Sequence, residues 1–100
     1  MRWANLLLAA HERPGVVDIA VLGPLTADTS QHVRETLNRH SSTVTRLRLR
    51  ACTAIDHEGP CALLLAHIEA GEAGGSVHLV EVPPLIEHYV HRHNAGHLLH

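Results

Sequence analysis

The chain has 100 residues, 45% of them apolar and 18% charged, and its formal net charge is −2. This length and composition favour one compact core, so we expect a single domain over residues 1–100. The basic side chains are all arginines, and a weakly acidic chain gives no sign of a nucleic-acid partner. The longest apolar stretches, residues 6–10 and 61–66, are far shorter than the roughly 20 residues that span a bilayer. The N-terminus lacks the pattern of a signal peptide, so we expect a cytoplasmic protein without direct membrane insertion.

Two apolar runs, residues 3–10 and 16–22, predict strands at the start of the chain. Residues 11–15 lie between them, include Pro14-Gly15 and are typical of a hairpin loop. We expect Gly23-Pro24 to end the second strand. The chain is therefore predicted to open as an antiparallel hairpin.

A helix is expected after the hairpin. Asp28 or Thr29 can cap its N-terminus, with Gln31 completing a capping box after Asp28, and the helix should end at about Arg39. Its predicted core-facing residues are Val33 and Leu37.

Residues 44–51 alternate strictly between the two faces of a predicted strand. Leu47 and Leu49 lie on one side, so the sheet is expected to have one covered and one exposed face. The other side carries Arg46, Arg48 and Arg50. Guanidinium groups match carboxylates and phosphates, so this row could recognise an anionic ligand or an acidic protein, although a solvated sheet face also accounts for it.

Three more elements are predicted in the second half of the chain. Gly59-Pro60 begins a helix, because Pro at the first helical position loses no needed N–H, and this helix ends near Gly71. Gly74-Gly75 forms a turn into a strand at residues 77–82. Pro83-Pro84 then begins a last helix, and the residues expected to share one of its faces are Leu85, Ile86, Tyr89 and Val90.

The predicted order of elements is strand, strand, helix, strand, helix, strand, helix, which indicates an α/β fold. Alternating strands and helices imply a mostly parallel sheet of four to five strands behind the antiparallel N-terminal hairpin. Right-handed crossovers would place the helices on one face of that sheet.

Three segments in this order resemble the STAS domain, the fold of bacterial anti-anti-sigma factors (anti-sigma factor antagonists) and of the cytoplasmic tails of sulfate transporters. Residues 16–25 are similar to the family's strand that ends in Gly-x-Leu-Asp, residues 47–59 to its central strand, and residues 74–80 to its turn into the last parallel strand. The resemblance covers nearly the whole chain. It implies a STAS-like fold and a role in protein binding, without enzymatic activity or a cofactor.

This sequence departs from the family at two positions. In the anti-anti-sigma branch the central strand runs into Asp-Ser-Ser-Gly or Asp-Ser-Thr-Gly, and a partner kinase, itself the anti-sigma factor, phosphorylates the second hydroxyl. Here Glu58 occupies the phosphoacceptor position, and Thr26 replaces the acid of Gly-x-Leu-Asp. The partner-binding surface that the resemblance implies consists of Asp56, His57, Glu58, Gly59, Leu63, Thr26 and Asp28.

Glu58 suits the start of a helix. Free N–H groups and a partial positive charge there stabilise a carboxylate or a phosphate, by roughly 0.3–1 kcal/mol for an exposed side chain. A phosphoserine has more charge and one more acceptor oxygen than a carboxylate, so Glu58 is a partial mimic. Two interpretations follow: a switch fixed in one state, or acidic residues that only cap the helix.

The leading hypothesis is regulation of transcription through binding of an anti-sigma factor of the serine-kinase type or another STAS-binding regulator; the chain could also form a homodimer. An alternative is a small STAS accessory subunit of an ABC-type transporter, because small free-standing STAS proteins also bind such transporters at their ATPase.

A small hydrolase or a metal protein is a third hypothesis. Cys61 follows His57 by four positions, as a nucleophile and a base would, but no further catalytic group accompanies them. Cys52 and Cys61 lack the spacing of a redox motif, and a disulfide is not expected. Four histidines near the C-terminus could bind a metal ion if they shared one helix face. Asn94 should end the last helix before the fourth of them, so no metal site is predicted. Those histidines are His88, His91, His93 and His97.

Overall fold

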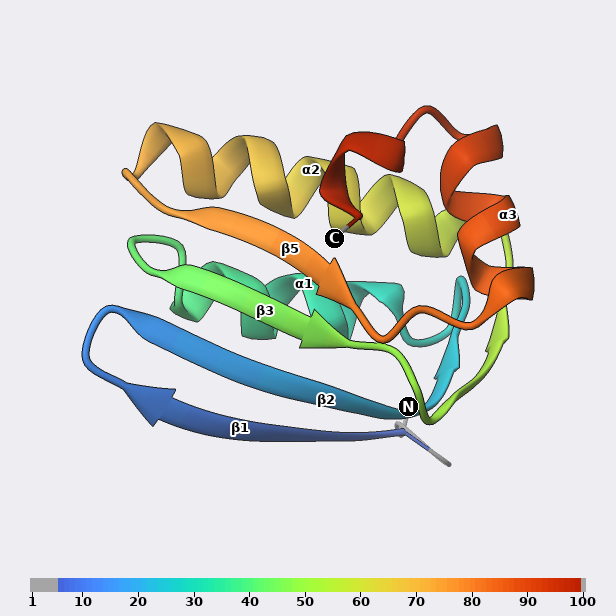
Figure 1. Ribbon diagram of the computed structural model, residues 1–100, viewed down its shortest axis with the longest axis horizontal. Helices are drawn as coiled ribbons and strands as arrows, with labels where there is room; N and C mark the ends of the chain where they lie inside the picture. Colours follow the sequence, from blue (N-terminus) through green and yellow to red (C-terminus); the bar gives the residue numbers. More distant parts are fainter. Residues whose placement is uncertain (1–5, 100) are drawn as a thin grey trace.

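The computed structural model describes residues 6–99 and contains a five-stranded mixed sheet with three α-helices. The elements are, in chain order, β1 (Leu7–Arg13), β2 (Val16–Leu25), α1 (Ser30–Arg39), β3 (Val44–Arg48), β4 (Cys52–Ile55), α2 (Glu58–Glu72), β5 (Ser76–Val80), α3 (Pro84–Arg92) and the short 3₁₀ helix η1 (Gly96–Leu98) (Figure 1).

The sheet has the strand order β1-β2-β3-β5, and β4 pairs with the far end of β2. β1 is antiparallel to β2, and every other pairing is parallel. Helices α1 and α2 lie side by side on one face of the sheet, and α3 lies at the end where the parallel strands finish (Figure 1). This is the predicted α/β architecture with a hairpin followed by parallel strands.

The core lies between the sheet and the two helices that cover it. Alternate residues of the central strands point into it, as the period of a strand requires, and Ile19 and Leu47 are fully buried. Val33 and Leu37 of α1 and Leu63 of α2 pack against them, and so the prediction for α1 is confirmed. Within residues 6–99, no helix combines the length and apolar character that a membrane span needs.

The N-terminal hairpin is tighter than predicted. β1 continues to Arg13, which pairs with Val16, so only Pro14-Gly15 form the turn. Pro14 presets the first turn position, and Gly15 takes the positive φ of 76° that the second requires. The prediction of a loop over residues 11–15 is therefore wrong, and the part of the predicted strand at residues 3–5 lies outside the described residues.

The sequence predicted that β2 would end at Gly23-Pro24, but the strand continues past these residues. It pairs with β3 over residues 16–20 and with β4 from Gly23 onward, with a register shift between Gly23 and Pro24. Pro24 lacks an N–H donor, and an irregularity in the ladder is where a strand tolerates proline. One long strand therefore supports two different neighbours.

The single strand predicted at residues 44–51 is two strands. β3 ends at Arg48, and a turn in which the N–H of Cys52 donates to the carbonyl of Leu49 (3.1 Å) leads into β4. Leu49 lies beyond the end of β3 but is still buried, so the alternation of buried and exposed residues continues past the end of the strand. For this reason the alternating pattern did not predict β4 as a separate strand.

The helix ends match the predictions closely, with different local contacts. α2 begins one residue before Gly59 and ends one residue after Gly71. The expected capping box of α1 does not form. The hydroxyl of Thr29 instead accepts from the N–H of Thr26 (3.0 Å) and donates to the carbonyl of Pro24 (2.8 Å).

The C-terminal elements are also close to those predicted. β5 stops at Val80, before the predicted residue 82, because Glu81 takes a positive φ of 52°. On α3, Ile86 and Val90 are buried as expected, whereas Leu85 is exposed and the prediction for it is wrong.

Leu63→Ala should destabilise the domain strongly and Leu65→Ala should not. Both leucines lie on α2, but Leu63 is 0% exposed and Leu65 is 45% exposed. Truncation of the buried side chain leaves a cavity and should lower the free energy of unfolding by about 2–5 kcal/mol, whereas the exposed one should cost about 0.5 kcal/mol or less. Urea unfolding followed by circular dichroism measures both; equal losses would contradict the assignment of the core face.

Candidate partner-binding site

The candidate site lies where β4 leads into α2. Asp56 and His57 connect the two elements, and Glu58 is the first residue of α2. The backbone N–H of Asp56 donates to the carbonyl of Leu25 (3.4 Å), at the end of β2. Because parallel strands end at the same edge of a sheet, the loop between β2 and α1 lies beside this segment and contains the predicted Thr26 and Asp28.

The carboxylate of Asp56 joins the two loops of the site. Its Oδ2 accepts from the N–H of Ala27 (3.0 Å), and its Oδ1 accepts from the N–H of Glu58 (2.9 Å). One side chain thus satisfies a free donor at the start of α2 and fixes the loop before α1. The positions of Asp56, Glu58 and the β2–α1 loop are consequently set together.

Glu58 lies at the helix N-terminus, as predicted. Its side chain is 49% exposed, and its Oε1 is 3.5 Å from Nε2 of His57. A carboxylate at this position is stabilised by the free N–H groups of the first turn and by the partial positive charge there. The site therefore presents a fixed negative charge to solvent.

A hollow of about 360 Å³ lies between α1 and α2, next to Glu58. Arg34 of α1 and Glu69 of α2 are joined by two hydrogen bonds, of 3.1 and 3.2 Å, and those bonds lower the pKa of Glu69. The ion pair ties the two helices to each other. The residues that line the hollow, which we call the α1–α2 groove, are Ser30, Gln31, Arg34, Glu35, Asn38, Glu58, Cys61, Ala62 and Leu65.

A second hollow, of about 280 Å³, opens on the other side of the β4–α2 segment. It is lined by Asp56 and His57 and by three residues of the α3 region that the sequence did not connect with the site: Tyr89, Arg92 and His93. The ring of His93 stacks on that of Tyr89, with centroids 6.3 Å apart, and is 6.4 Å from the ring of His57. No local sequence motif predicts the contact between His93 and His57, because this contact depends on α3 packing beside β4.

Two of the predicted contact residues are buried, and this corrects the prediction. Leu63 belongs to the core, so its side chain cannot form part of a docking surface in this structure. Gly59 is buried against β2: a Cβ there would lie 2.7 Å from the carbonyl oxygen of Leu25. The exposed apolar side chains of α2 are those of Leu65 and Ile68.

The candidate metal and thiol groups do not form a common site. Among residues 6–99, no group of three or more His, Cys, Asp or Glu side chains is arranged to hold a metal ion. His91 lies 3.7 Å from Glu87 on its own helix. Cys52 is buried and Cys61 is exposed in the α1–α2 groove, and both are free thiols.

Gly59→Ala should destabilise the protein, whereas Gly71→Ala should not. The new methyl group at position 59 would collide with the backbone of Leu25 and force β2 and α2 apart, while nothing lies within 4 Å of the corresponding atom at Gly71. We expect a loss of about 1–3 kcal/mol for Gly59→Ala and a change between zero and a gain of about 1 kcal/mol for Gly71→Ala. Thermal unfolding of both variants tests this, and a neutral Gly59→Ala would disprove the close approach.

Under native conditions, iodoacetamide should alkylate Cys61 and leave Cys52 unmodified. Burial raises the pKa of the Cys52 thiol, so it is both shielded and poor in thiolate, whereas Cys61 is exposed. Mass spectrometry after cleavage by endoproteinase Glu-C, which separates the two cysteines at Glu58, measures the two rates, with urea-unfolded protein as the control in which both cysteines react. Equal native rates would contradict the burial of Cys52.

No protein-family model and no curated protein matches the sequence. Solved structures do match the fold. The anti-sigma factor antagonist SpoIIAA in its unphosphorylated form superposes with a TM-score of 0.77 at 15% identity, covering 94% of this chain and 86% of that one. The phosphorylated form of the Bacillus cell fate determinant SpoIIAA gives 0.70 at 15% identity, covering 94% and 89%.

A larger protein contains the same fold. The murine anion transporter Solute Carrier 26 family member A9 matches with a TM-score of 0.70 at 19% identity, over 82% of this chain and 14% of the transporter chain. Similarity at these identities establishes a common fold. The chain therefore has the STAS fold of the anti-sigma factor antagonists, which confirms the resemblance seen in its sequence.

Proposed function

We propose that this protein is a cytoplasmic STAS-type regulator of transcription whose partner is an anti-sigma factor of the serine-kinase type or a related regulator. In this proposal the switch of the family is fixed, because Glu58 occupies the position of the phosphorylated hydroxyl. The observation that carries the proposal is the placement of Glu58: in a STAS fold, directly after the β4–α2 junction, half-exposed at the first residue of α2.

The proposed contact surface consists of the exposed parts of Asp56, His57, Glu58, Thr26 and Asp28. The two hydrogen bonds to the Asp56 carboxylate hold these residues in one arrangement, so a partner would meet a surface that is already ordered. The α1–α2 groove continues the surface from Glu58 to Leu65, which adds an exposed apolar side chain beside the charge. A charged group next to an apolar one is the usual composition of a protein interface.

A fixed carboxylate has a definite consequence for affinity. A kinase of this type must bring its own phosphate-donating site against the residue at position 58, and a negative charge there repels the γ-phosphate of its nucleotide. In the family the modified form is the released one, so Glu58 should weaken binding to such a kinase. The proposal therefore assigns this protein the behaviour of a permanently modified antagonist.

Glu58→Ser should restore binding to a serine-kinase anti-sigma factor. With the bait well below its Kd, where yield follows affinity, we expect a tagged Glu58→Ser bait to capture such a kinase from host lysate with at least about tenfold greater yield than the wild type, which corresponds to about 1.4 kcal/mol. The captured kinase should also phosphorylate the variant and not the wild type. Mass spectrometry of captured proteins and of the bait measures both results.

Glu72→Ser is the matched control, because Glu72 is exposed at the opposite end of α2 and undergoes the same chemical change. It should behave as the wild type. Bound kinase should also slow the alkylation of Cys61, which lines the groove beside Glu58. If all baits return the same transporter ATPase and no sigma-system protein, the regulatory role is wrong and the protein is a transporter subunit.

A further inference from the structure

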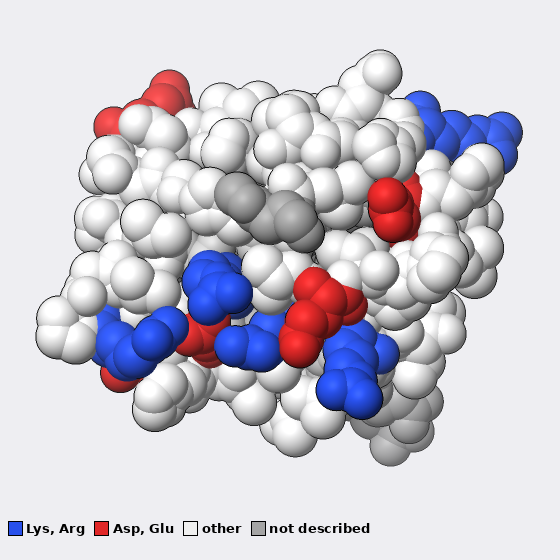
Figure 2. All heavy atoms as spheres, in the orientation of Figure 1, with Lys and Arg blue, Asp and Glu red and all other residues white. Residues whose placement is uncertain are grey.

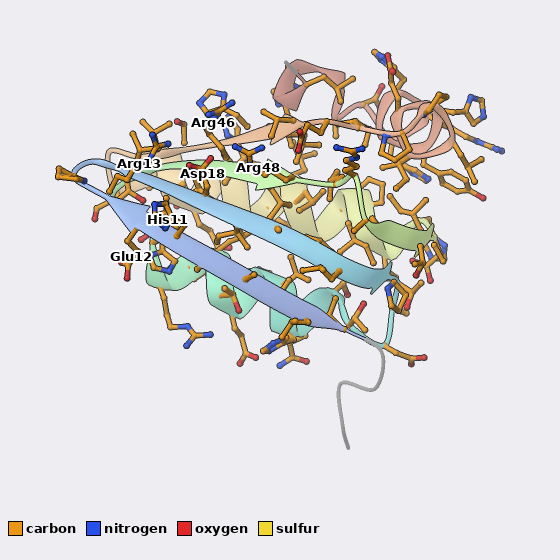
Figure 3. All side chains as sticks on the ribbon, turned by 60° about the horizontal axis from the view of Figure 1, so that its bottom comes forward. His11, Glu12, Arg13, Asp18, Arg46 and Arg48 are labelled. Atoms are coloured by element: carbon orange, nitrogen blue, oxygen red, sulfur yellow. The ribbon has the colours of Figure 1, made fainter. Side chains whose placement is uncertain are left out.

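The face of the sheet opposite α1 and α2 carries a row of charged side chains. The strand register places Asp18 of β2 beside Arg46 and His78, on β3 and β5, and places Arg48 in the next row. Arg13, at the end of β1, reaches Asp18 from the other side (Figure 3). We call this set, Arg13, Asp18, Arg46 and Arg48, the arginine face.

Asp18 lies beneath the three arginines and is 9% exposed. Its Oδ2 accepts a hydrogen bond from Arg13 (2.5 Å), but Arg46 and Arg48 remain 3.7 and 3.8 Å from its Oδ1, too far for hydrogen bonds. That buried Oδ1 has no hydrogen-bond partner in the described part of the chain. The carboxylate therefore attracts the two guanidinium groups without using their donors.

The two guanidinium groups also face solvent. The side chains of Arg46 and Arg48 are 43% and 40% exposed, and Arg48 shares one donor with Glu81 at 3.2 Å. A guanidinium group has five N–H donors in a planar fork, so both arginines have donors left for another acceptor. Carboxylates fit that fork with two parallel hydrogen bonds.

The arginine face is locally cationic on an acidic molecule. Three guanidinium groups stand against the carboxylates of Asp18 and Glu81, whereas the whole chain has a net charge of −2. Figure 2 shows the arginines gathered in a band across this face, with acidic side chains between them. Interleaved charges of both signs disfavour a uniformly anionic surface and favour a partner with spaced carboxylates.

An apolar hollow of about 230 Å³ adjoins the arginines. It is lined by Val44, Arg46, His78 and Val80, and Val44 is partly exposed. The hollow can take an aliphatic side chain of an extended segment, and the residue two positions away, which points to the same side, can then place a carboxylate on Arg46.

We propose that the arginine face is a second docking surface, which binds an extended acidic segment of a protein partner with carboxylates two residues apart and an aliphatic side chain two residues beyond them, all on one side of the segment. The segment's carboxylates pair with Arg46 and Arg48, and an aliphatic side chain enters the hollow beside Val44. This surface lies on the opposite side of the sheet from α1 and α2, so it is independent of the surface around Glu58.

The test uses two fluorescein-labelled peptides, Glu-Ser-Glu-Ser-Leu, whose two carboxylates and leucine share one side when extended, and its amide counterpart Gln-Ser-Gln-Ser-Leu, and measures fluorescence anisotropy. The acidic peptide should bind at least about tenfold more tightly than the amide peptide, and about 0.5 M salt should weaken the binding of the acidic peptide. Arg46→Gln should reduce binding at least about fivefold. Arg39→Gln, which removes the same charge from the exposed end of α1 on the helix-covered side, should leave binding unchanged.

A second pair of variants separates specific pairing from net charge. Asp18→Asn removes the carboxylate that competes for Arg46 and Arg48 and should strengthen binding of the acidic peptide. Glu12→Gln makes the same change in net charge, but Glu12 pairs with the core-facing Val17 and lies near His40, so its side chain is on the helix-covered side and binding should not change. Circular dichroism confirms that each variant is folded.

The proposal is overturned if neither peptide binds, if both bind equally, or if Arg46→Gln and Arg39→Gln have the same effect. It is also overturned if phosphatidylglycerol vesicles bind the wild type and not Arg46→Gln while the acidic peptide does not bind, since the face would then serve a membrane surface. None of these outcomes depends on Glu58, so this experiment tests the arginine face independently of the proposed function.

Discussion

The arrangement of the candidate site depends on the carboxylate of Asp56. It accepts hydrogen bonds from two backbone N–H groups that are 31 residues apart in the chain, those of Ala27 and Glu58. Hydrogen bonds to a charged acceptor are among the stronger ones, and here they satisfy donors that neither the sheet nor the helix can pair. Without this carboxylate, no side-chain hydrogen bond among residues 6–99 would join the loop before α1 to the start of α2, and a partner would have to order both.

Much of this arrangement could be predicted from local sequence signals. Pro60 and Gly59 mark the start of α2, and the alternation around Leu47 marks a half-covered strand, because both signals depend on neighbours along the chain. β4 could not be predicted, since the turn before it keeps Leu49 buried and leaves the alternating pattern intact. The contact between His57 and His93 could not be predicted either, because it depends on the packing of α3 beside β4.

Leu63 illustrates a more general limit. When a helix is apolar nearly all round, its sequence pattern does not predict which side is buried. The pattern therefore does not distinguish Leu63 from Leu65. The position of α1 decides between them: α2 turns Leu63 toward the sheet and leaves Leu65 over the groove it shares with α1. The buried face of such a helix is a property of tertiary packing, and the surface available to a partner follows from it.

In the proposed function, a carboxylate at position 58 makes this protein a regulator that phosphorylation does not switch at that position. A kinase and a phosphatase can add and remove a phosphate, but neither can change the charge of Glu58. In that proposed state, the fraction of protein in complex would depend only on the concentrations and affinities of its partners. A second surface on the opposite face of the sheet would then offer a separate input, because β2 and β3 carry Asp18 and Arg46 on one side and core residues on the other. Binding at that face could bring a second protein to the domain without altering the charge beside Asp56.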